Sequence, residues 1–342
     1  MSFRVGVVGA TGYSGTIAAR LVAQHPSLTL AFATSDAKKG ASYAHLGIRA
    51  EGTLVANALA EARAEGCDAV VLATPAEVSL ELAPRLRTRY PDLTICDLSG
   101  AFRLRPASLY ERYYKLTHTS PGLLEAAFYG LPELFGAPPR GALVSSPGCY
   151  PTATLLALAP VASLVDEGAF HVDAKSGTTG AGRQAKEEHS FAEVDENLRA
   201  YKVHDHQHEP EINLHLARKT GVTPDVVFVP HLLPVRRGIL VTAYARLKSG
   251  VAEDAVKKAY EAAYAGKRFV RFAPPGEVTL ASVVGTNDAV LGWSVRGRSL
   301  VAFAAIDNLI KGAGGQGIQS LNLALGLAED AGLDHLTRSA AG

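Results

Sequence analysis

One cysteine lies in surroundings that favour a nucleophile. Residues 145–154 read SSPGCYPTAT, with Cys149 near the centre. An apolar run at 141–144 precedes this stretch and a helix-forming run at 152–165 follows it, so Cys149 is expected between a strand and a helix. Pro151 suits a first helical turn, where free N–H groups and the helix dipole favour thiolate over thiol. The sequence predicts a reactive thiolate, with a buried inert cysteine as the alternative.

A histidine-rich segment offers a partner for this thiolate. Residues 204–211 read HDHQHEPE, and alternate side chains of an extended segment share a face. Neither a cysteine cluster nor an HExxH helix accompanies it, so we expect no metal site. A plain polar loop is the other alternative to acid/base chemistry. We favour His208 as the acid/base, because Pro210 restrains the loop and Glu211 could orient the ring; His206 would then contact the substrate.

Two further segments carry residues suited to an anionic ligand. The loop at 176–183 is rich in small and hydroxylic residues, and its Ser176 and Gly177 could bring backbone close to a carboxylate or phosphate. Arg183 ends this loop. Arg103, which follows SGAF at 99–102, presents a planar fork that suits the same ligands, although surface arginines are common. We therefore assign these residues, with Glu211, to the substrate.

The chain begins with a strand, a glycine turn and a helix. An apolar strand at 3–8 runs into Gly9, Gly12 and Gly15, and a helical pattern covers 16–24. Glycines there permit a tight turn, close approach of backbone to a pyrophosphate and close contact between helix and strand. The spacing departs from the commonest Gly-x-Gly-x-x-Gly form. The sequence predicts a dinucleotide site over this turn, which also contains Thr11, Tyr13 and Ser14.

The end of the second predicted strand, 28–33, indicates which dinucleotide is bound. An NAD site favours a carboxylate there for the ribose 2′-hydroxyl. Here Thr34 and Ser35 come first, with Lys38 and Lys39 close behind, which favours the 2′-phosphate of NADP(H); Asp36 argues the other way. A solvated loop is the alternative reading of the lysine pair.

The remaining pattern positions these groups in two domains. Strands at 69–73 and 93–98 flank a helix at 77–89, which predicts an α/β, Rossmann-like doubly wound parallel sheet over residues 1–148. The second half predicts an α+β domain over 149–312 with a mostly antiparallel sheet, and a helical pattern follows within 313–342. The expected strands of the second domain are 172–175, 226–229, 239–247, 278–284 and 300–306.

Composition limits the partners and the compartment. The 342 residues include 34 Lys and Arg against 33 Asp and Glu, for a net charge of +1. No basic footprint for nucleic acid stands out, and no apolar run reaches the length of a membrane span. Three cysteines without framework spacing favour a reducing, cytoplasmic location. We expect a small-molecule partner.

Taken together, these motifs resemble the N-acetyl-γ-glutamyl-phosphate reductases of arginine biosynthesis, in their stand-alone form. The resemblance runs over essentially the whole chain. Its motifs are Gly9-x-x-Gly12-x-x-Gly15, YGLPE at 129–133, PGCYPTA at 147–153, the loop from Ser176-Gly177 to Gly182-Arg183, His206-x-His208-x-Pro210-Glu211, RGI at 237–239 and AIDNL-x-KG at 305–312. The chain departs from the family at Gly100-Ala101, where Ala-Asp is frequent, and at Ser146, where Asn is frequent.

The resemblance implies an NADPH-dependent enzyme that reduces an acyl phosphate to an aldehyde and releases inorganic phosphate. Cys149 would be the nucleophile, and the pair His206 and His208 would hold the acid/base. Residues 12–15, Ser35 and Asn308 would contact NADP. The α+β domain over 149–312 would be inserted into the Rossmann-like domain, which the C-terminal helix within 313–342 would complete, and the enzyme would be a homo-oligomer, a tetramer. A carrier-linked aminoadipyl-phosphate reductase, an aspartate-semialdehyde dehydrogenase and a non-enzymatic NADP-binding regulator are the alternatives.

Overall fold

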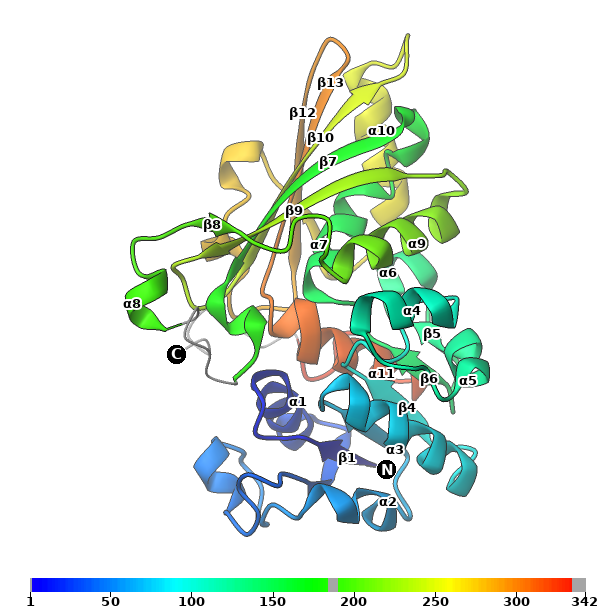
Figure 1. Ribbon diagram of the computed structural model, residues 1–342, viewed down its shortest axis with the longest axis vertical. Helices are drawn as coiled ribbons and strands as arrows, with labels where there is room; N and C mark the ends of the chain where they lie inside the picture. Colours follow the sequence, from blue (N-terminus) through cyan, green and yellow to red (C-terminus); the bar gives the residue numbers. More distant parts are fainter. Residues whose placement is uncertain (1, 184–189, 334–342) are drawn as a thin grey trace. The chain divides into compact units, whose positions relative to one another are not determined.

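The computed structural model describes residues 2–183 and 190–333 of the chain (Figure 1). The described residues fall into two compact units, one formed by 2–148 with 313–333 and the other by 149–183 with 190–312. The chain thus leaves the first unit before Cys149 and returns to it after Gly312.

The first unit is built on a six-stranded parallel sheet of order β2-β1-β3-β4-β6-β5. Its strands are β1 (Phe3–Val8), β2 (Leu28–Ala33), β3 (Ala69–Leu72), β4 (Thr94–Asp97), β5 (Phe128–Tyr129) and β6 (Leu143–Ser145). Its helices are α1 (Tyr13–Gln24), α2 (Ala60–Arg63), α3 (Ala76–Arg89), α4 (Ala107–Tyr114), α5 (Pro121–Ala126), α6 (Pro132–Phe135) and α11 (Gly315–Ala324).

Both faces of this sheet are buried. Val8, Val70 and Leu72 join a core cluster with apolar residues of α2 and α3. Their neighbours Val7 and Val71, which point to the opposite face, are also fully buried. A sheet covered on both sides needs strands that are apolar at successive positions, as β1 and β3 are. The predicted doubly wound sheet is confirmed.

The last described helix, α11, belongs to this first unit. It packs against α1 and β4, and the side chains of Gln316 and Ser320 both donate to the carbonyl of Gly130, at 2.9 and 3.2 Å. The predicted terminal segment thus contributes one helix, Gly315–Ala324, and its residues 334–342 lie outside the described residues.

The second unit carries a seven-stranded mixed sheet of order β11-β12-β13-β10-β7-β9-β8. Its strands are β7 (Val165–Gly177), β8 (Arg199–Ala200), β9 (Asp225–Leu233), β10 (Ile239–Leu247), β11 (Val270–Phe272), β12 (Ala289–Arg296) and β13 (Ser299–Ile306). Its helices are α7 (Cys149–Leu158), α8 (Phe191–Val194), α9 (His208–Thr220) and α10 (Glu253–Tyr264), and a π-helical turn, η8 (Ile310–Gly314), follows β13. The pairs β11–β12 and β7–β9 are parallel, and the other pairs are antiparallel.

Helices cover one face of this sheet. Helix α7 packs on β10, β12 and β13, α9 packs beside it on β9, and the hydroxyls of Tyr260 and Tyr264 on α10 donate to carbonyls of α7. The other face carries half-exposed residues such as Val227, Val301 and Tyr244, the last 46% exposed. The second unit therefore has one packed face and one open face.

One predicted strand of the second unit is wrong, and one predicted helix has different bounds. Residues 278–284 do not form a strand; they include a 3-10 turn, η7 (Leu280–Ser282), and Val278 and Val283 pack with Val290 and Ala305 in a small apolar cluster. The strand that pairs with β13 is instead β12, which the sequence analysis missed. The helix predicted at 152–165 begins earlier and ends earlier, at Cys149 and Leu158.

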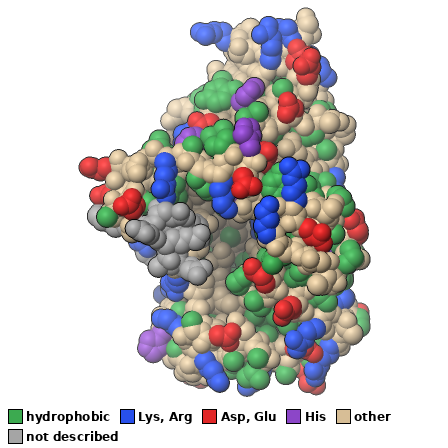
Figure 2. Space-filling view, in the orientation of Figure 1, with side chains coloured by type: hydrophobic (Ala, Val, Ile, Leu, Met, Phe, Trp, Pro, Cys, Tyr) green, Lys and Arg blue, Asp and Glu red, His purple; other side chains and the backbone are tan. Residues whose placement is uncertain are grey.

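The described surface mixes charges of both signs. Figure 2 shows acidic and basic side chains interspersed over the face in view. This distribution agrees with the net charge of +1.

Candidate active site

The glycine turn after β1 is closely packed. Gly9 has φ +82°, and a Cβ there would lie 2.5 Å from the carbonyl oxygen of Ala73. A Cβ on Gly15 would lie 2.1 Å from the carbonyl oxygen of Gly9, so the helix can approach the strand only because residue 15 is glycine. Helix α1 starts at Tyr13 with Gly12 as its N-cap, and no side chain caps its first turn. This arrangement fits a pyrophosphate at the start of α1.

The end of β2 presents hydroxyls beside this turn. The hydroxyl of Ser35 lies 2.7 Å from that of Thr11 and accepts the N–H of Lys38 at 3.3 Å. The carboxylate of Asp36 accepts two hydrogen bonds from Asn57, at 2.8 Å from its backbone and 2.9 Å from its side chain. Asp36 is thus held by Asn57, while Lys38 lies exposed next to Ser35.

Arg103 is buried within the first unit. Its Nε donates to the carbonyl of Ser146 and a terminal nitrogen donates to the carbonyl of Leu98, both at 2.7 Å. The guanidinium therefore ties the end of β4 to the end of β6. Burial raises the pKa of the neighbouring Asp97, although hydrogen bonds from Ser99 and the charge of Arg103 act in the opposite direction.

Cys149 is the first residue of α7 and is only partly buried. It packs against Gly312 in η8, where a Cβ would lie 2.7 Å from the Cβ of Cys149. The N–H of Gly312 donates to the carbonyl of Asp307 at 2.8 Å. Two segments far apart in the sequence thus fix the backbone around the thiol.

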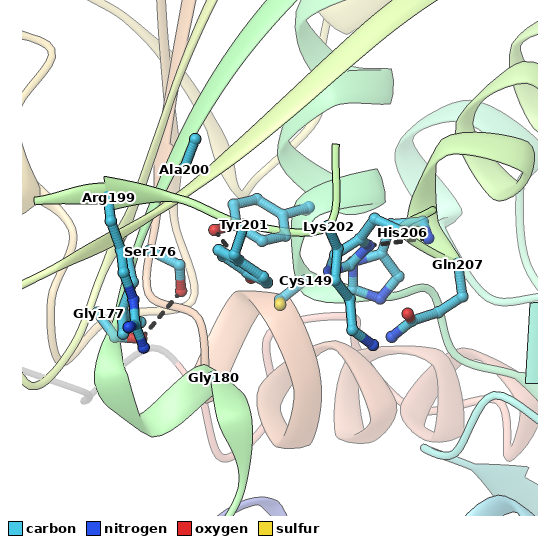
Figure 3. Close-up of a pocket in the computed structure, with 13 residues that line it drawn as sticks. Cys149, Ser176, Gly177, Gly180, Arg199, Ala200, Tyr201, Lys202, His206 and Gln207 are labelled. Atoms are coloured by element: carbon cyan, nitrogen blue, oxygen red, sulfur yellow. Dashed lines mark hydrogen bonds between the residues drawn. The ribbon is translucent and has the colours of Figure 1, made fainter. Parts of the chain in front are cut away.

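A cavity of about 510 Å³ in the second unit gathers the predicted reactive groups (Figure 3). Cys149 lines it from the start of α7, and Ser176 and Gly177 line it from the end of β7. His208, the first residue of α9, and His206, just before that helix, line it as well. These residues come from three separate elements, which the fold brings together around the thiol. Arg183 and Glu211 are not among the residues that line it.

The hydrogen bond and the burial of His206 determine which ring nitrogen carries a proton and whether the ring is charged. Its Nδ1 accepts the backbone N–H of His208 at 3.1 Å, so the proton of the neutral ring lies on Nε2. Burial, assisted by the positive charge of Lys202, lowers the pKa of His206 to about 3. At neutral pH His206 is therefore a neutral hydrogen-bond donor.

Aromatic rings hold the two histidines. Tyr150 packs edge-on against the rings of His206 and His208, with centroids 5.9 Å apart in both pairs. The hydroxyl of Tyr150 donates to the carbonyl of His231 at 3.0 Å and lies 3.4 Å from the hydroxyl of Tyr201. Burial raises the pKa of Tyr150, and it raises the pKa of Tyr201 to about 12, so both phenols stay neutral.

The histidines do not lie on one extended segment as predicted. His206 precedes α9, whereas His208 is its first residue. Glu211 follows one helical turn later and is fully buried. Pro210 therefore lies in the first turn of a helix, where proline is tolerated, rather than in a loop.

Asn308 holds the loop that borders the cavity. Its side-chain oxygen accepts the N–H of Gly238 at 2.7 Å, and its amide nitrogen donates to the hydroxyl of Thr179 at 3.0 Å. Gly177 is equally constrained, because a Cβ there would lie 2.7 Å from the backbone nitrogen of Arg237. The amide of Asn308 thus supports the loop after β7.

The sequence analysis missed several cavity residues, among them Arg199, Tyr201 and Lys202. These three lie in a segment without regular spacing, and their place depends on the pairing of β8 with β9. They belong to none of the motifs identified in the sequence.

Within 2–183 and 190–333, no three His, Cys, Asp or Glu side chains gather in a way that could hold a metal ion. Over the same residues, no helix is both long enough and apolar enough to cross a membrane.

Two protein-family models match the chain, and the boundary between their matches lies close to the boundary between the two structural units. Residues 4–139 match the family model described as semialdehyde dehydrogenase, NAD binding domain. Residues 149–308 match the model described as semialdehyde dehydrogenase, dimerisation domain.

Curated relatives cover nearly the whole chain. N-acetyl-gamma-glutamyl-phosphate reductase from Symbiobacterium thermophilum is 42% identical over 97% of this chain and 98% of its own length. The protein of the same name from Pelotomaculum thermopropionicum is 40% identical over the same shares.

Solved structures share the fold at low identity. Aspartate semialdehyde dehydrogenase II from Vibrio cholerae, complexed with ASA, has a TM-score of 0.72 at 15% identity and covers 95% of this chain and 98% of its own. Aspartate semialdehyde dehydrogenase from Candida albicans, solved with NADP, has a TM-score of 0.62 at 15% identity over 94% of this chain and 99% of its own.

Proposed function

Because the chain belongs to the N-acetyl-γ-glutamyl-phosphate reductase family, we propose that it reduces N-acetyl-γ-glutamyl phosphate to N-acetylglutamate 5-semialdehyde with NADPH, a step of arginine biosynthesis. The observation that carries this proposal is the cavity that gathers Cys149, His206 and His208. A thiol at a helix start can act as the nucleophile of acyl transfer through a thioester, a neutral imidazole can donate to the acyl oxygen, and a second imidazole can transfer the proton.

The reaction starts with the Cys149 thiolate attacking the acyl carbon. The bond from this carbon to the phosphate oxygen breaks, inorganic phosphate leaves, and the acyl group remains on the sulfur as a thioester. The Nε2–H of His206 donates to the carbonyl oxygen of the bound substrate and holds the acyl group near the thiolate.

Bound NADPH would supply the hydride that reduces the thioester carbon. Hydride addition leaves negative charge on the thiohemiacetal oxygen, which takes a proton from the His208 imidazolium. The neutral His208 ring takes this proton back as the carbon–sulfur bond breaks and the aldehyde forms. The aldehyde leaves and the thiolate is restored. Tyr150 keeps both imidazole rings in place through these steps.

We assign NADP(H) to the turn formed by Gly9, Thr11, Gly12, Tyr13, Ser14 and Gly15. Ser35 and Lys38 would bind the 2′-phosphate, which the engagement of Asp36 by Asn57 supports. NADP(H) should bind at least tenfold more tightly than NAD(H), a difference of about 1.4 kcal/mol. Titration of the protein with each nucleotide measures this ratio, and equal dissociation constants would rule the assignment out.

The substrate is tested in the phosphate-driven reverse direction. With NADP and inorganic phosphate, kcat/KM for N-acetylglutamate 5-semialdehyde should far exceed kcat/KM for aspartate semialdehyde. The opposite preference would favour the alternative function, that of an aspartate-semialdehyde dehydrogenase. Binding of NADP without turnover of any aldehyde would favour a regulatory protein.

The open face of the second unit is proposed as a contact between copies of the chain. Its apolar strand residues and the description of residues 149–308 as a dimerisation domain support a homo-oligomer. We retain the tetramer as the expected state. Three free cysteines favour a cytoplasmic location for the assembly.

A further inference from the structure

Two cationic side chains line the cavity that holds Cys149. Among its described lining residues, these are Arg199 and Lys202. Neither has a role in the acyl transfer proposed above. Figure 3 shows Arg199 extending toward Ser176 and Gly177, whereas Lys202 lies with His206 and Gln207 in another part of the cavity, and Cys149 is drawn between the two groups. The cavity therefore offers positive charge in two places.

The turn that carries Lys202 has an unusual backbone. Lys202 has φ 46° and His204 has φ 62°, a left-handed conformation that non-glycine residues rarely adopt. The N–H of Asp205 donates to the carbonyl of Lys202 at 3.1 Å and closes the turn. The ammonium is near enough to His206 to affect its titration. Lys202 therefore lies on the histidine side of the cavity, where the reacting carbonyl must be held.

Arg199 is held from a different element. It lies in β8 opposite Leu232 of β9, and Leu232 itself lines the cavity. The neighbouring Ser176 donates from its hydroxyl to the carbonyl of Gly177 at 3.1 Å. The guanidinium thus enters the cavity beside the loop after β7, away from the histidines in Figure 3.

The proposed substrate has two anionic ends. Its phosphate is bonded directly to the carbon that Cys149 attacks, whereas its α-carboxylate lies at the far end of an aliphatic chain. A planar guanidinium matches a carboxylate through two parallel hydrogen bonds, and a lysine ammonium serves as a compact point charge for phosphate. The positions of the two cations correspond to these two ends.

We propose that Arg199 binds the α-carboxylate of the substrate and that Lys202 binds the phosphate that is released or taken up. This inference rests on the proposed function. It makes Arg199 the residue that selects an amino-acid derivative over a simple aldehyde. It makes Lys202 the residue that sets the affinity for inorganic phosphate.

The carboxylate role is tested with two aldehydes that differ only in that group. N-acetylglutamate 5-semialdehyde and 4-acetamidobutanal, which lacks the carboxylate, are oxidised with NADP and phosphate. Arg199→Gln should lower kcat/KM for the first aldehyde about 50-fold, the value of a hydrogen bond to a charged group, and should change the second by less than about twofold. An equal loss for both aldehydes would overturn the role of Arg199. Arg199→Lys, which keeps the charge without the fork, should lose less than Arg199→Gln.

The phosphate role is tested with the same assay. Lys202→Gln should raise KM for inorganic phosphate about tenfold or more while KM for the aldehyde changes little. Lys219→Gln, the same charge change at an exposed position of α9, is the control and should alter neither constant. An unchanged phosphate KM in Lys202→Gln would contradict the assignment.

Folding and the proposed function are checked separately. Thermal unfolding and NADP titration show whether each variant is folded, and a variant that has lost both is replaced by Arg199→Lys or Lys202→Arg. If the wild-type protein oxidises neither aldehyde, the proposed function fails. If it oxidises N-acetylglutamate 5-semialdehyde and the variants lose no selectivity, only the present inference fails.

Discussion

At the scale of single residues, one cavity brings together a thiol and two imidazoles, those of Cys149, His206 and His208. Local sequence singles out these three candidates, because Cys149 stands between a turn and a helix and the histidines stand in a histidine-rich segment. Arg199 and Lys202 were not predictable, because a short strand pairing and a left-handed turn bring them there. The hydrogen bonds of Arg103 to two backbone carbonyls were also not predictable from the sequence, because only the fold brings these carbonyls near its side chain.

Substitutions of the two histidines should have different effects on the kinetic constants. His208→Asn removes the group that handles the proton, so kcat should fall about 100-fold with little change in KM. His206→Asn removes a hydrogen-bond donor held by the backbone, so its main effect should be on KM for the acyl substrate. Steady-state kinetics of both variants from pH 6 to 9 distinguishes the roles. If His208→Asn keeps the wild-type kcat and His206→Asn loses it, the two proposed roles must be exchanged.

His206 should also make the protein sensitive to acid. Its pKa is lowered to about 3 in the folded protein by burial and by Lys202, whereas the unfolded chain titrates at 6.5. Below pH 6.5 the unfolded state therefore binds more protons than the folded state. The stability that the neutral His206 ring contributes is present above pH 6.5 and is lost as the pH falls toward 3. Between pH 7 and pH 5 it amounts to about 2 kcal/mol.

Urea unfolding at pH 7 and pH 5 measures this effect. His206→Gln lacks the titrating ring, so its free energy of unfolding should fall less between the two pH values than that of the wild-type protein. Equal losses in both proteins would show that His206 does not stay neutral when folded.

At the scale of elements, strands with clear patterns were predicted well, and β10 was predicted with its observed bounds. Residues 278–284 include four β-branched residues, Val278, Thr279, Val283 and Val284, and this composition favours a strand. In the structure the segment instead forms short turns that pack against the open face. The role of the segment 307–312 was also not predictable. The carboxylate of Asp307 accepts two local hydrogen bonds from the N–H groups of Leu309 and Ile310. It also accepts hydrogen bonds from Arg237 and Gly285, which are distant in sequence and reach it only in the fold.

Gly312 should be essential for placing the thiol. An added Cβ would lie 2.7 Å from the Cβ of Cys149 and 3.2 Å from its Cα, so Gly312→Ala must displace the nucleophile or η8. Small displacements of reacting groups are costly, and kcat should fall about 100-fold. Gly276→Ala is the control, since a Cβ there has no neighbour within 4 Å. Kinetics of both variants tests this, and normal turnover in Gly312→Ala would show that the contact has no catalytic importance.

At the scale of the whole molecule, the division into two units was predicted from the change in pattern at Cys149, and the structure divides the described residues at the same place. The return of the chain to the first unit depends on α11 and its bonds to Gly130, which no local pattern encodes. The open face of the second unit is a property of the sheet as a whole. Opposed residues such as Tyr244, His171 and Val301 share that face by register.

Association should depend on this open face. Tyr244→Asp places a charge at its centre and should reduce the mass of the assembly measured by light scattering after size-exclusion chromatography. Leu59→Asp makes a comparable change at an exposed apolar residue of the first unit and should leave the mass unchanged. A wild-type mass equal to one chain, or no response to Tyr244→Asp, would contradict an interface on this face.

The central claim is that the acyl group passes through a thioester on Cys149. The most direct test mixes the protein with NADP and N-acetylglutamate 5-semialdehyde without phosphate, then quenches in acid for mass mapping. We expect a burst of about one NADPH per chain and the acyl group on the peptide that contains Cys149. Cys67 and Cys96 should stay unmodified, because burial raises the pKa of both thiols. Normal turnover in Cys149→Ala, or an acyl group found on any other residue, would contradict the claim.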